Sequence, residues 1–165
     1  MTDSSSVLAN PAPEVRDSGH FARIVVGVDG SDSSIEALRQ AKTIADAFHS
    51  TLDIVCAWSL PISNYGMMPP YWNPDRDAAQ LVDAAAESVY GAQLPEGVRT
   101  TIAEGSPARV LIQQSESADL IVTGSRGHGG FAGLLLGSVS SEIAAHAHCP
   151  VLIVHPHHAG TRDGA

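Results

Sequence analysis

Short apolar runs alternate with longer stretches in which apolar residues recur at helical spacing. Mainly apolar runs lie at residues 23–29, 51–58, 119–123 and 150–154 and predict strands, and the continuous apolar stretch within 23–29 is typical of a strand buried on both faces of a sheet. A further strand is predicted at 98–103. Two helices are predicted from apolar stripes, the first formed by Ile35, Leu38, Ala41, Ala45 and Phe48 and the second, within residues 77–90, by Ala78, Leu81, Val82, Ala85 and Val89.

Capping residues mark where the helices should begin. Ser33 and Glu36 have the spacing of a capping box and predict the start of the first helix. Ser106 followed by Pro107 predicts the N-cap and first residue of a third helix, and a fourth should begin near Ser138. Strands that alternate with helices indicate parallel βαβ units. We therefore predict a single-domain, doubly wound, Rossmann-like α/β fold with five parallel strands and four helices.

Composition and charge restrict the partners and the compartment. The domain is predicted to span residues 21–156, between disordered polar tails at 1–20 and 157–165. The net charge of −9, with Lys42 as the one lysine, disfavours nucleic acid and anionic membranes as partners. The sequence shows neither a membrane-spanning run nor a secretory signal, and its two cysteines do not form a CxxC pair, so we expect a cytoplasmic protein.

Two loops should carry the ligand chemistry. In open α/β sheets, ligands bind at the carboxyl ends of the strands, where strand order reverses. The loops predicted at that edge are residues 27–31, after the first strand, and residues 124–138, which contain six glycines in fifteen residues. Glycine permits positive φ and close approach of a ligand to backbone amides, and the helix that follows offers a positive dipole end. The second loop is therefore a candidate phosphate site.

The spacing of glycines in that loop separates three kinds of phosphate site. A Walker A loop is excluded because Lys42 lies in the first helix, and the match of residues 127–132 to a dinucleotide fingerprint is poor. Gly124, Gly127, nine further residues and then Gly137-Ser138 instead resemble the ATP-binding branch of the universal stress protein family. The segments VVGVDGSDSS, EGSPA at 104–108 and CPVLIVH carry the same resemblance, which covers residues 22–155.

The resemblance implies a ligand position for several residues. Asp29 would lie near the ribose and a phosphate-bound Mg²⁺, as the one protein metal ligand, although it could instead only cap the first helix. Arg126 could neutralise phosphate charge or lie in solvent. The implied ATP-binding residues are Gly27, Val28 and Asp29 after the first strand, Ala57 at the adenine, Thr123, Gly124, Arg126 and Gly127 at base, ribose and first phosphate, and Gly137, Ser138 and Val139 at the remaining phosphates.

The same resemblance implies a role and an assembly. The chain should be an ATP-binding, nucleotide-dependent module of the stress response; a slow ATPase and a cyclic-AMP-binding protein are the alternatives. A homodimer is implied in which the last strands of two subunits meet about a two-fold axis. Zinc binding by the C-terminal histidines is disfavoured by their spacing. The segment 59–75 is either a lid over the pocket or a flexible insertion.

Overall fold

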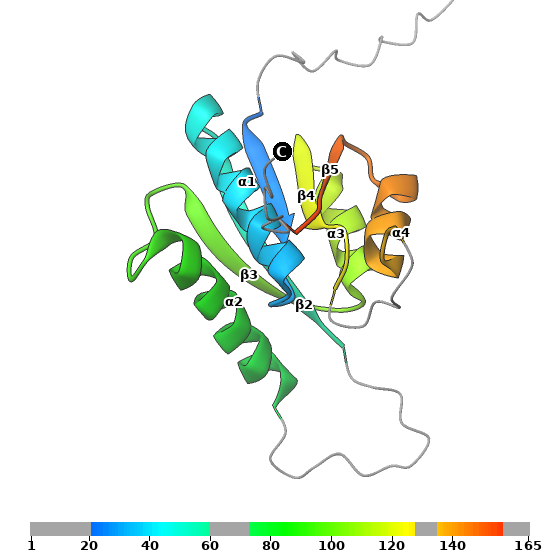
Figure 1. The fold of residues 1–165 in the computed structure, drawn as a ribbon, viewed down its shortest axis with the longest axis horizontal. Coiled ribbons are helices and arrows are strands. Elements are labelled where there is room, and N and C mark those ends of the chain that lie inside the picture. Colours follow the sequence, from blue (N-terminus) through cyan, green and yellow to red (C-terminus); the bar gives the residue numbers. More distant parts are fainter. Residues whose placement is uncertain (1–20, 60–72, 128–134, 157–165) are drawn as a thin grey trace, which may run out of the picture.

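The predicted doubly wound fold is present. The computed structural model describes residues 21–59, 73–127 and 135–156 (Figure 1). Five parallel strands form one sheet in the order β3-β2-β1-β4-β5. The strands are β1 (Arg23–Gly27), β2 (Thr51–Trp58), β3 (Val98–Glu104), β4 (Leu120–Gly124) and β5 (Val151–Val154), and the helices are α1 (Asp32–Phe48), α2 (Pro74–Tyr90), α3 (Pro107–Ser115) and α4 (Ser138–His146).

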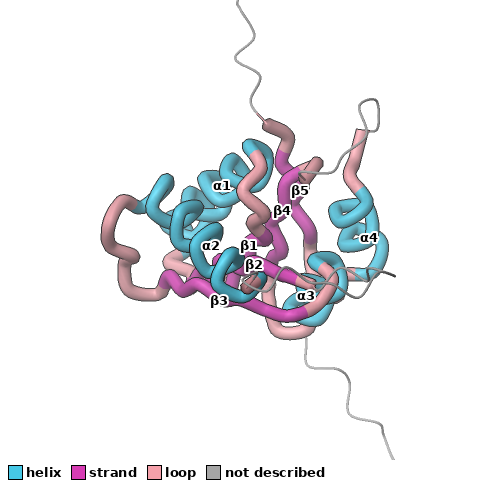
Figure 2. The backbone as a smooth tube through the Cα atoms, turned by 90° about the horizontal axis from the view of Figure 1, so that it is seen from below, coloured by secondary structure: helices cyan, strands magenta, loops and turns pink. Residues whose placement is uncertain are grey.

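The helices cover both faces of the sheet. Figure 2 shows α1 and α2 on one side and α3 and α4 on the other. Alternate residues of each strand supply the two cores, since successive side chains point to opposite faces. In β1, Ile24 and Val26 pack in the core under α1 and α2, whereas Val25 packs in the core under α3 and α4. All three side chains are fully buried, which explains why the strand reads as an unbroken apolar run.

Two predicted helix starts are corrected by the structure. Ser31, not Ser33, is the N-cap of α1, and its Oγ accepts the N–H of Ser34 at 3.3 Å. The capping-box prediction was therefore wrong, because the Ser33 hydroxyl is used elsewhere: it donates to the carbonyl of Arg126. Helix α2 begins at Pro74 rather than residue 77, capped by Asn73, whose side chain accepts the Arg76 N–H at 3.2 Å.

Strand order reverses between β1 and β4, and this sets the place of a ligand. The chain leaves β1 toward β2 on one side, while β4 and β5 lie on the other side. Strand β1 ends at Gly27, two residues earlier than predicted, so Val28 and Asp29 belong to the loop. Because adjacent connections diverge at this point, a crevice opens at the carboxyl ends of β1 and β4.

A buried carboxylate links the strands β1, β2 and β3. Asp53 in β2 is 3% exposed. Its carboxylate bonds Arg23 of β1 at 2.6 Å and Arg99 of β3 at 2.8 Å, which joins three adjacent strands. Hydrogen bonding to Asp53 raises the pKa of Arg99.

Some predictions fall on residues beyond the described ranges. The tails at 1–20 and 157–165 lie outside them, as does most of the segment 59–75. None of the helices in the described part of the chain combines the length and the hydrophobicity that a membrane crossing requires.

Candidate functional site

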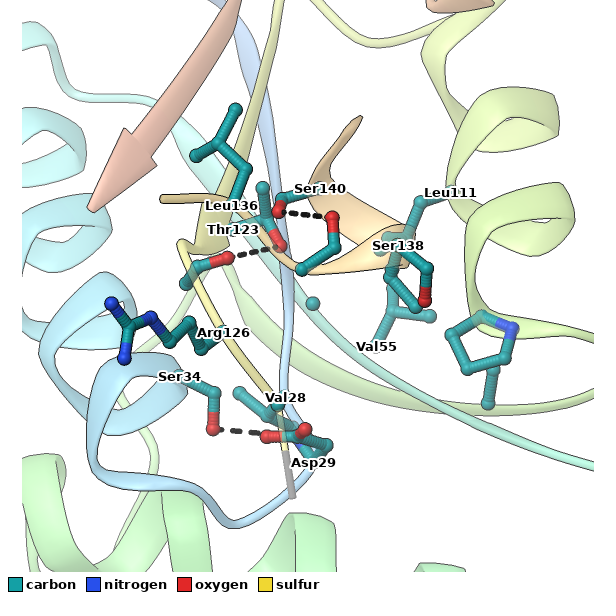
Figure 3. A pocket seen from close by; sticks show the side chains of 17 residues that line it. Val28, Asp29, Ser34, Val55, Leu111, Thr123, Arg126, Leu136, Ser138 and Ser140 are labelled. Atoms are coloured by element: carbon teal, nitrogen blue, oxygen red, sulfur yellow. Dashed lines mark hydrogen bonds between the residues drawn. The ribbon is translucent and has the colours of Figure 1, made fainter. Parts of the chain in front are cut away.

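A pocket of about 360 Å³ opens at the carboxyl ends of β1 and β4 (Figure 3). Strand β2 and the first turns of α3 and α4 complete its walls. All the residues that sequence reasoning assigned to the ligand line this one pocket: Gly27, Val28, Asp29, Ala57, Thr123, Gly124, Arg126, Gly127, Gly137, Ser138 and Val139. Segments more than one hundred residues apart in the chain thus converge at the predicted edge.

Sequence reasoning missed a second set of lining residues. Val55 could have been found, because it lies two residues before Ala57 and so faces the same side of β2. Leu111 could not, since it reads as an ordinary core position of α3, where it is 4% exposed. The full missed set is Ser34, Val55, Leu111, Leu136 and Ser140; Pro107, from a turn expected to be structural and to border the site, also lines the pocket.

Asp29 organises the turn between β1 and α1. Its Oδ1 accepts the N–H of Ser31 at 3.0 Å and the hydroxyl of Ser31 at 2.6 Å. Asp29 is therefore not the N-cap of α1, a position that Ser31 holds. Beneath the turn, burial raises the pKa of the Cys56 thiol, and the negative charge of Asp29 raises it further. The carboxylate itself lines the pocket.

Ser33 of α1 holds the glycine-rich loop. Its hydroxyl donates to the carbonyl of Arg126, whereas the hydroxyl of Ser31, whose hydrogen bonds Oδ1 of Asp29, lies 3.3 Å from the same carbonyl oxygen. Close approach here depends on glycine: a Cβ on Gly124 would lie 2.5 Å from Oγ of Ser33, and one on Gly127 would overlap Oδ2 of Asp29. Neither glycine has a positive φ. Close packing, not left-handed backbone, is therefore what requires glycine at these two positions.

The first turn of α4 presents unbonded amides beside the pocket. The N–H of Ser141 donates to the carbonyl of Gly137 at 3.0 Å, which is the first bond of the helix. The N–H groups of Ser138, Val139 and Ser140 have no acceptor among the described residues. Gly137 itself differs, because its N–H donates to the carbonyl of Ser125 at 2.7 Å. An anion would therefore meet the amides after Gly137, at the positive end of the helix dipole.

The backbone of Ala57 faces the pocket beyond the end of β1. Residues of a parallel strand direct their N–H and C=O alternately to the two neighbouring strands. The carbonyl of Val55 accepts from Val28 on the β1 side at 2.9 Å, and that of Trp58 accepts from Gly105 on the β3 side at 2.8 Å. Ala57 thus faces the β1 side, where β1 has already ended, and its N–H and C=O have no partner among the described residues.

The charged side chains around the pocket are few. Of its described lining residues, Asp29 and Arg126 are charged. The Arg126 side chain extends away from Ser138, on the side where α1 begins (Figure 3). Within the described residues, no group of three His, Cys, Asp or Glu side chains is close enough to form a metal site, and this includes His146, His148 and His155. A cation here would need oxygens from its ligand in addition to Asp29.

The chain is similar to known proteins of one family. Residues 20–155 match the model of the universal stress protein family. The chain belongs to the universal stress protein family. This universal stress protein is 34% identical over 155 residues to universal stress protein Rv2623 of Mycobacterium tuberculosis, a match that covers 92% of this chain and 48% of that relative. The chain thus spans about half the length of the mycobacterial relatives that it matches.

Other relatives are of similar length to this universal stress protein. A Thermus aquaticus universal stress protein is 34% identical over 139 residues, with 81% of this chain and 98% of that protein covered. A universal stress protein crystallised in complex with cAMP is 33% identical, with a TM-score of 0.56 and coverage of 84% and 99%. UspA from Lactobacillus plantarum, at 24% identity, a TM-score of 0.60 and coverage of 82% and 98%, shows the shared fold.

Proposed function

We propose that this universal stress protein binds ATP with Mg²⁺ in the pocket at β1 and β4 and acts as a nucleotide-dependent regulatory module of the stress response. The observation that carries the proposal is the pair of amides at Ser138 and Val139, which lie beside the pocket at the start of α4 and have no acceptor within residues 21–59, 73–127 and 135–156. A helix N-terminus with unpaired N–H groups favours phosphate. The spacing from Gly124 to Ser138, which resembles the ATP-binding branch, supports the same ligand.

The other end of the pocket suits adenine. Ala57 offers one backbone donor and one acceptor, side by side, on the pocket side of β2. Adenine presents the complementary pair, an acceptor at N1 and a donor at N6, whereas guanine presents the reverse order on the same edge. Val55, Leu111 and Val139 add apolar surface to the pocket for a flat base. We therefore expect ATP to bind more tightly than GTP.

Asp29 is the residue that would hold Mg²⁺ in this proposal. A carboxylate beside a triphosphate is repelled unless a divalent cation lies between them. Mg²⁺ is commonly held by one or two carboxylates together with the phosphates of its ligand, which a site with the single carboxylate of Asp29 can satisfy. The bonds from Ser31 fix one oxygen of Asp29, so the carboxylate is already oriented.

The charged groups of the pocket favour nucleotide binding over nucleotide hydrolysis. Phosphoryl transfer needs groups that orient a nucleophile and neutralise developing charge. Asp29 and Arg126 are the charged members of the described lining, and Arg126 extends away from Ser138 (Figure 3). A binding role, with conformation or partner choice set by the nucleotide, follows more directly than hydrolysis. Slow ATP hydrolysis is the enzymatic alternative that experiment must separate.

Cyclic AMP is the second candidate ligand. The relative that was crystallised with cAMP is 33% identical to this chain over nearly the same length. Cyclic AMP shares the adenine that the Ala57 backbone would read, but it carries one phosphate charge and needs no Mg²⁺. It would use fewer of the amides at α4. We rank it below ATP because several unbonded amides lie together there.

Calorimetric titration of purified protein separates these ligands. ATP, ADP, cAMP and GTP are each titrated with and without Mg²⁺, and mass spectrometry identifies any nucleotide that copurifies. The proposal expects ATP to bind most tightly, in a Mg²⁺-dependent manner. Tighter binding of cAMP without Mg²⁺ would identify cAMP as the ligand of this site, and release of ADP over hours would establish hydrolysis of ATP. Absence of binding by every nucleotide would refute the proposal.

Assembly and compartment complete the proposal. Strand β5 lies at one edge of the sheet, and an open apolar edge is unfavourable in solution. We propose that two subunits pair through β5 in a homodimer. Neither Cys56 nor Cys149 forms a disulfide in the described part of the chain, which fits the reducing cytoplasm as the compartment.

A further inference from the structure

We propose that Ser140 is a positioning residue that fixes the direction of the amides of Ser138 and Val139 toward a bound phosphate. The inference rests on the proposed function, and it assigns a role to a residue that the glycine-and-serine spacing does not include. Ser140 is the third residue of α4 and is 2% exposed. Its Oγ lies 3.1 Å from the carbonyl oxygen of Ser125 and 3.1 Å from that of Gly137. Figure 3 shows Ser138 and Ser140 together on the α4 side of the pocket.

The peptide units of Ser125 anchor this turn to the sheet. Ser125 is fully buried, and its N–H donates to the carbonyl of Val154 in β5 at 2.7 Å. Its carbonyl accepts both the N–H of Gly137, at 2.7 Å, and the hydroxyl of Ser140. The first turn of α4 is thus attached to the end of the sheet at one carbonyl oxygen, by two donors that lie three residues apart.

The second of these donors is what keeps the turn from pivoting. Val139 and Ile143 hold α4 in the core, but with the Gly137 bond alone its first turn would be attached to the Ser125 loop at a single point. The Ser140 hydroxyl shares its one hydrogen between the carbonyls of Ser125 and Gly137, and through Ser125 it adds a second attachment of the turn. The peptide units of Ser138 and Val139 lie between the two attached residues, Gly137 and Ser140. Those amides have no acceptor among the described residues, so no bond of their own orients them. Their direction therefore depends on Ser140.

A serine whose hydroxyl bonds only within its own helix makes a different set of contacts from Ser140. Ser88 in α2 bonds the carbonyl three residues before it, Ala85, at 2.7 Å, and no bond from its hydroxyl to another element is recorded among the described residues. Such local bonds have little effect on the rest of a protein. Ser140 has the same local bond to Gly137 but also reaches Ser125, which belongs to the loop after β4. The bond between elements is the one that has consequences for the pocket.

Removal of the hydroxyl should loosen the turn without unfolding the protein. In Ser140→Ala, Gly137 keeps its bond to Ser125, and Ser141 keeps its bond to Gly137. A hydrogen bond of this kind typically contributes enough to change an affinity about three- to tenfold. Because the loss concerns only the phosphate end, the effect should depend on whether the ligand carries phosphates.

The test compares ATP with adenosine in Ser140→Ala, Ser140→Thr and the matched control Ser88→Ala. We expect Ser140→Ala to bind ATP about three- to tenfold more weakly and adenosine within about twofold of wild type. Ser140→Thr, which keeps a hydroxyl, should recover ATP affinity, and Ser88→Ala should match wild type for both ligands. Equal loss of ATP and adenosine, or unchanged ATP affinity, would overturn the positioning role.

A measurement on the ligand-free protein keeps this inference separate from the proposed function. ¹⁵N relaxation reports the order of the Ser138 and Val139 amides, with order parameters near about 0.85 for rigid backbone and below about 0.6 for flexible backbone. We expect these values to fall in Ser140→Ala and to stay high in Ser88→Ala. If no nucleotide binds the wild type, the ATP proposal fails while this readout still decides on Ser140. Unchanged order in Ser140→Ala would refute the inference by itself.

Discussion

Gly127 lies so close to Asp29 that any side chain on Gly127 would overlap Oδ2 of the Asp29 carboxylate. The two residues belong to the loops after β4 and β1, which flank the reversal of strand order. The absence of a side chain at Gly127 thus makes room for a protein group that lines the pocket. This relation distinguishes Gly127 from Gly137, where the atoms nearest to an added Cβ lie 3.4 Å away or more, at ordinary contact.

Gly127→Ala should weaken Mg²⁺-dependent ATP binding because the methyl group displaces the Asp29 carboxylate. We expect roughly a tenfold loss of affinity and a decrease of about 1–2 kcal/mol in the free energy of unfolding. Gly137→Ala is the control for stability and should stay within about 0.5 kcal/mol of wild type. Titration calorimetry and urea unfolding measure the two quantities. Wild-type affinity in Gly127→Ala would show that the position of Asp29 is irrelevant to the ligand.

Gly137→Val should abolish nucleotide binding while the fold is retained. The backbone of Gly137 has φ −73° and ψ 164°, an extended conformation that any residue adopts. The branched side chain would instead occupy space at the pocket beside the amides of Ser138 and Val139. Circular dichroism and thermal unfolding check the fold, and an ATP titration checks the site. Binding at wild-type strength would remove α4 from the phosphate site.

How much of this arrangement the sequence predicts depends on the kind of interaction. Apolar runs such as that of β1 predicted four of the strands, because burial on both faces leaves a clear pattern, and β3, whose residues are exposed or partly buried, was predicted without such a run. The loops after the first and fourth strands predicted the edge of the sheet at which the pocket lies. The start of α1 was missed because Ser31, Ser33 and Ser34 are all suitable capping residues, and only the contact of Ser33 with Arg126, far along the chain, decides between them.

The lining residues that were missed have a common cause. Leu111 reaches the pocket because α3 packs tightly on β1: a Cβ on Gly27 would lie 2.5 Å from Cδ1 of Leu111. Such a contact between elements has no signature in local sequence, where Leu111 reads as a core residue. The same holds for Ser140, whose bond to Ser125 crosses from a helix to a loop. Hydrophobic periodicity and sequence motifs predict helices, strands and loops, but they do not predict which residues of a helix contact another element.

Asp29→Asn separates the structural role of Asp29 from its proposed role at the cation. Asparagine keeps an Oδ1 that can accept from Ser31 but removes the charge that Mg²⁺ requires. We expect near wild-type stability and the loss of most of the increase in ATP affinity that Mg²⁺ provides. Asp29→Ala should in addition lose about 1 kcal/mol of stability, because the turn before α1 loses its acceptor. An equal loss of affinity with and without Mg²⁺ would assign Asp29 to the ribose instead.

The two apolar positions of β5 on its α4 side should respond differently to charge, and this tests the proposed dimer. Val151 and Ile153 are both partly buried, but Val151 packs against the core under α3 and α4 that contains Ile121 and Ile143, so Val151→Asp should destabilise the subunit itself by about 1–3 kcal/mol. Ile153 does not belong to either core of the described residues. Ile153→Asp should therefore leave the fold intact and shift the dimer to monomer, because the two-fold symmetry places the substitution in the interface twice.

Ile102→Asp, on the opposite edge strand β3 and 36% exposed, is the matched control and should keep the dimer. Light scattering after size exclusion reads the mass of each variant. A wild-type protein that is monomeric at micromolar concentration would refute pairing through β5, whereas dissociation of the Ile102→Asp variant would move the interface to β3.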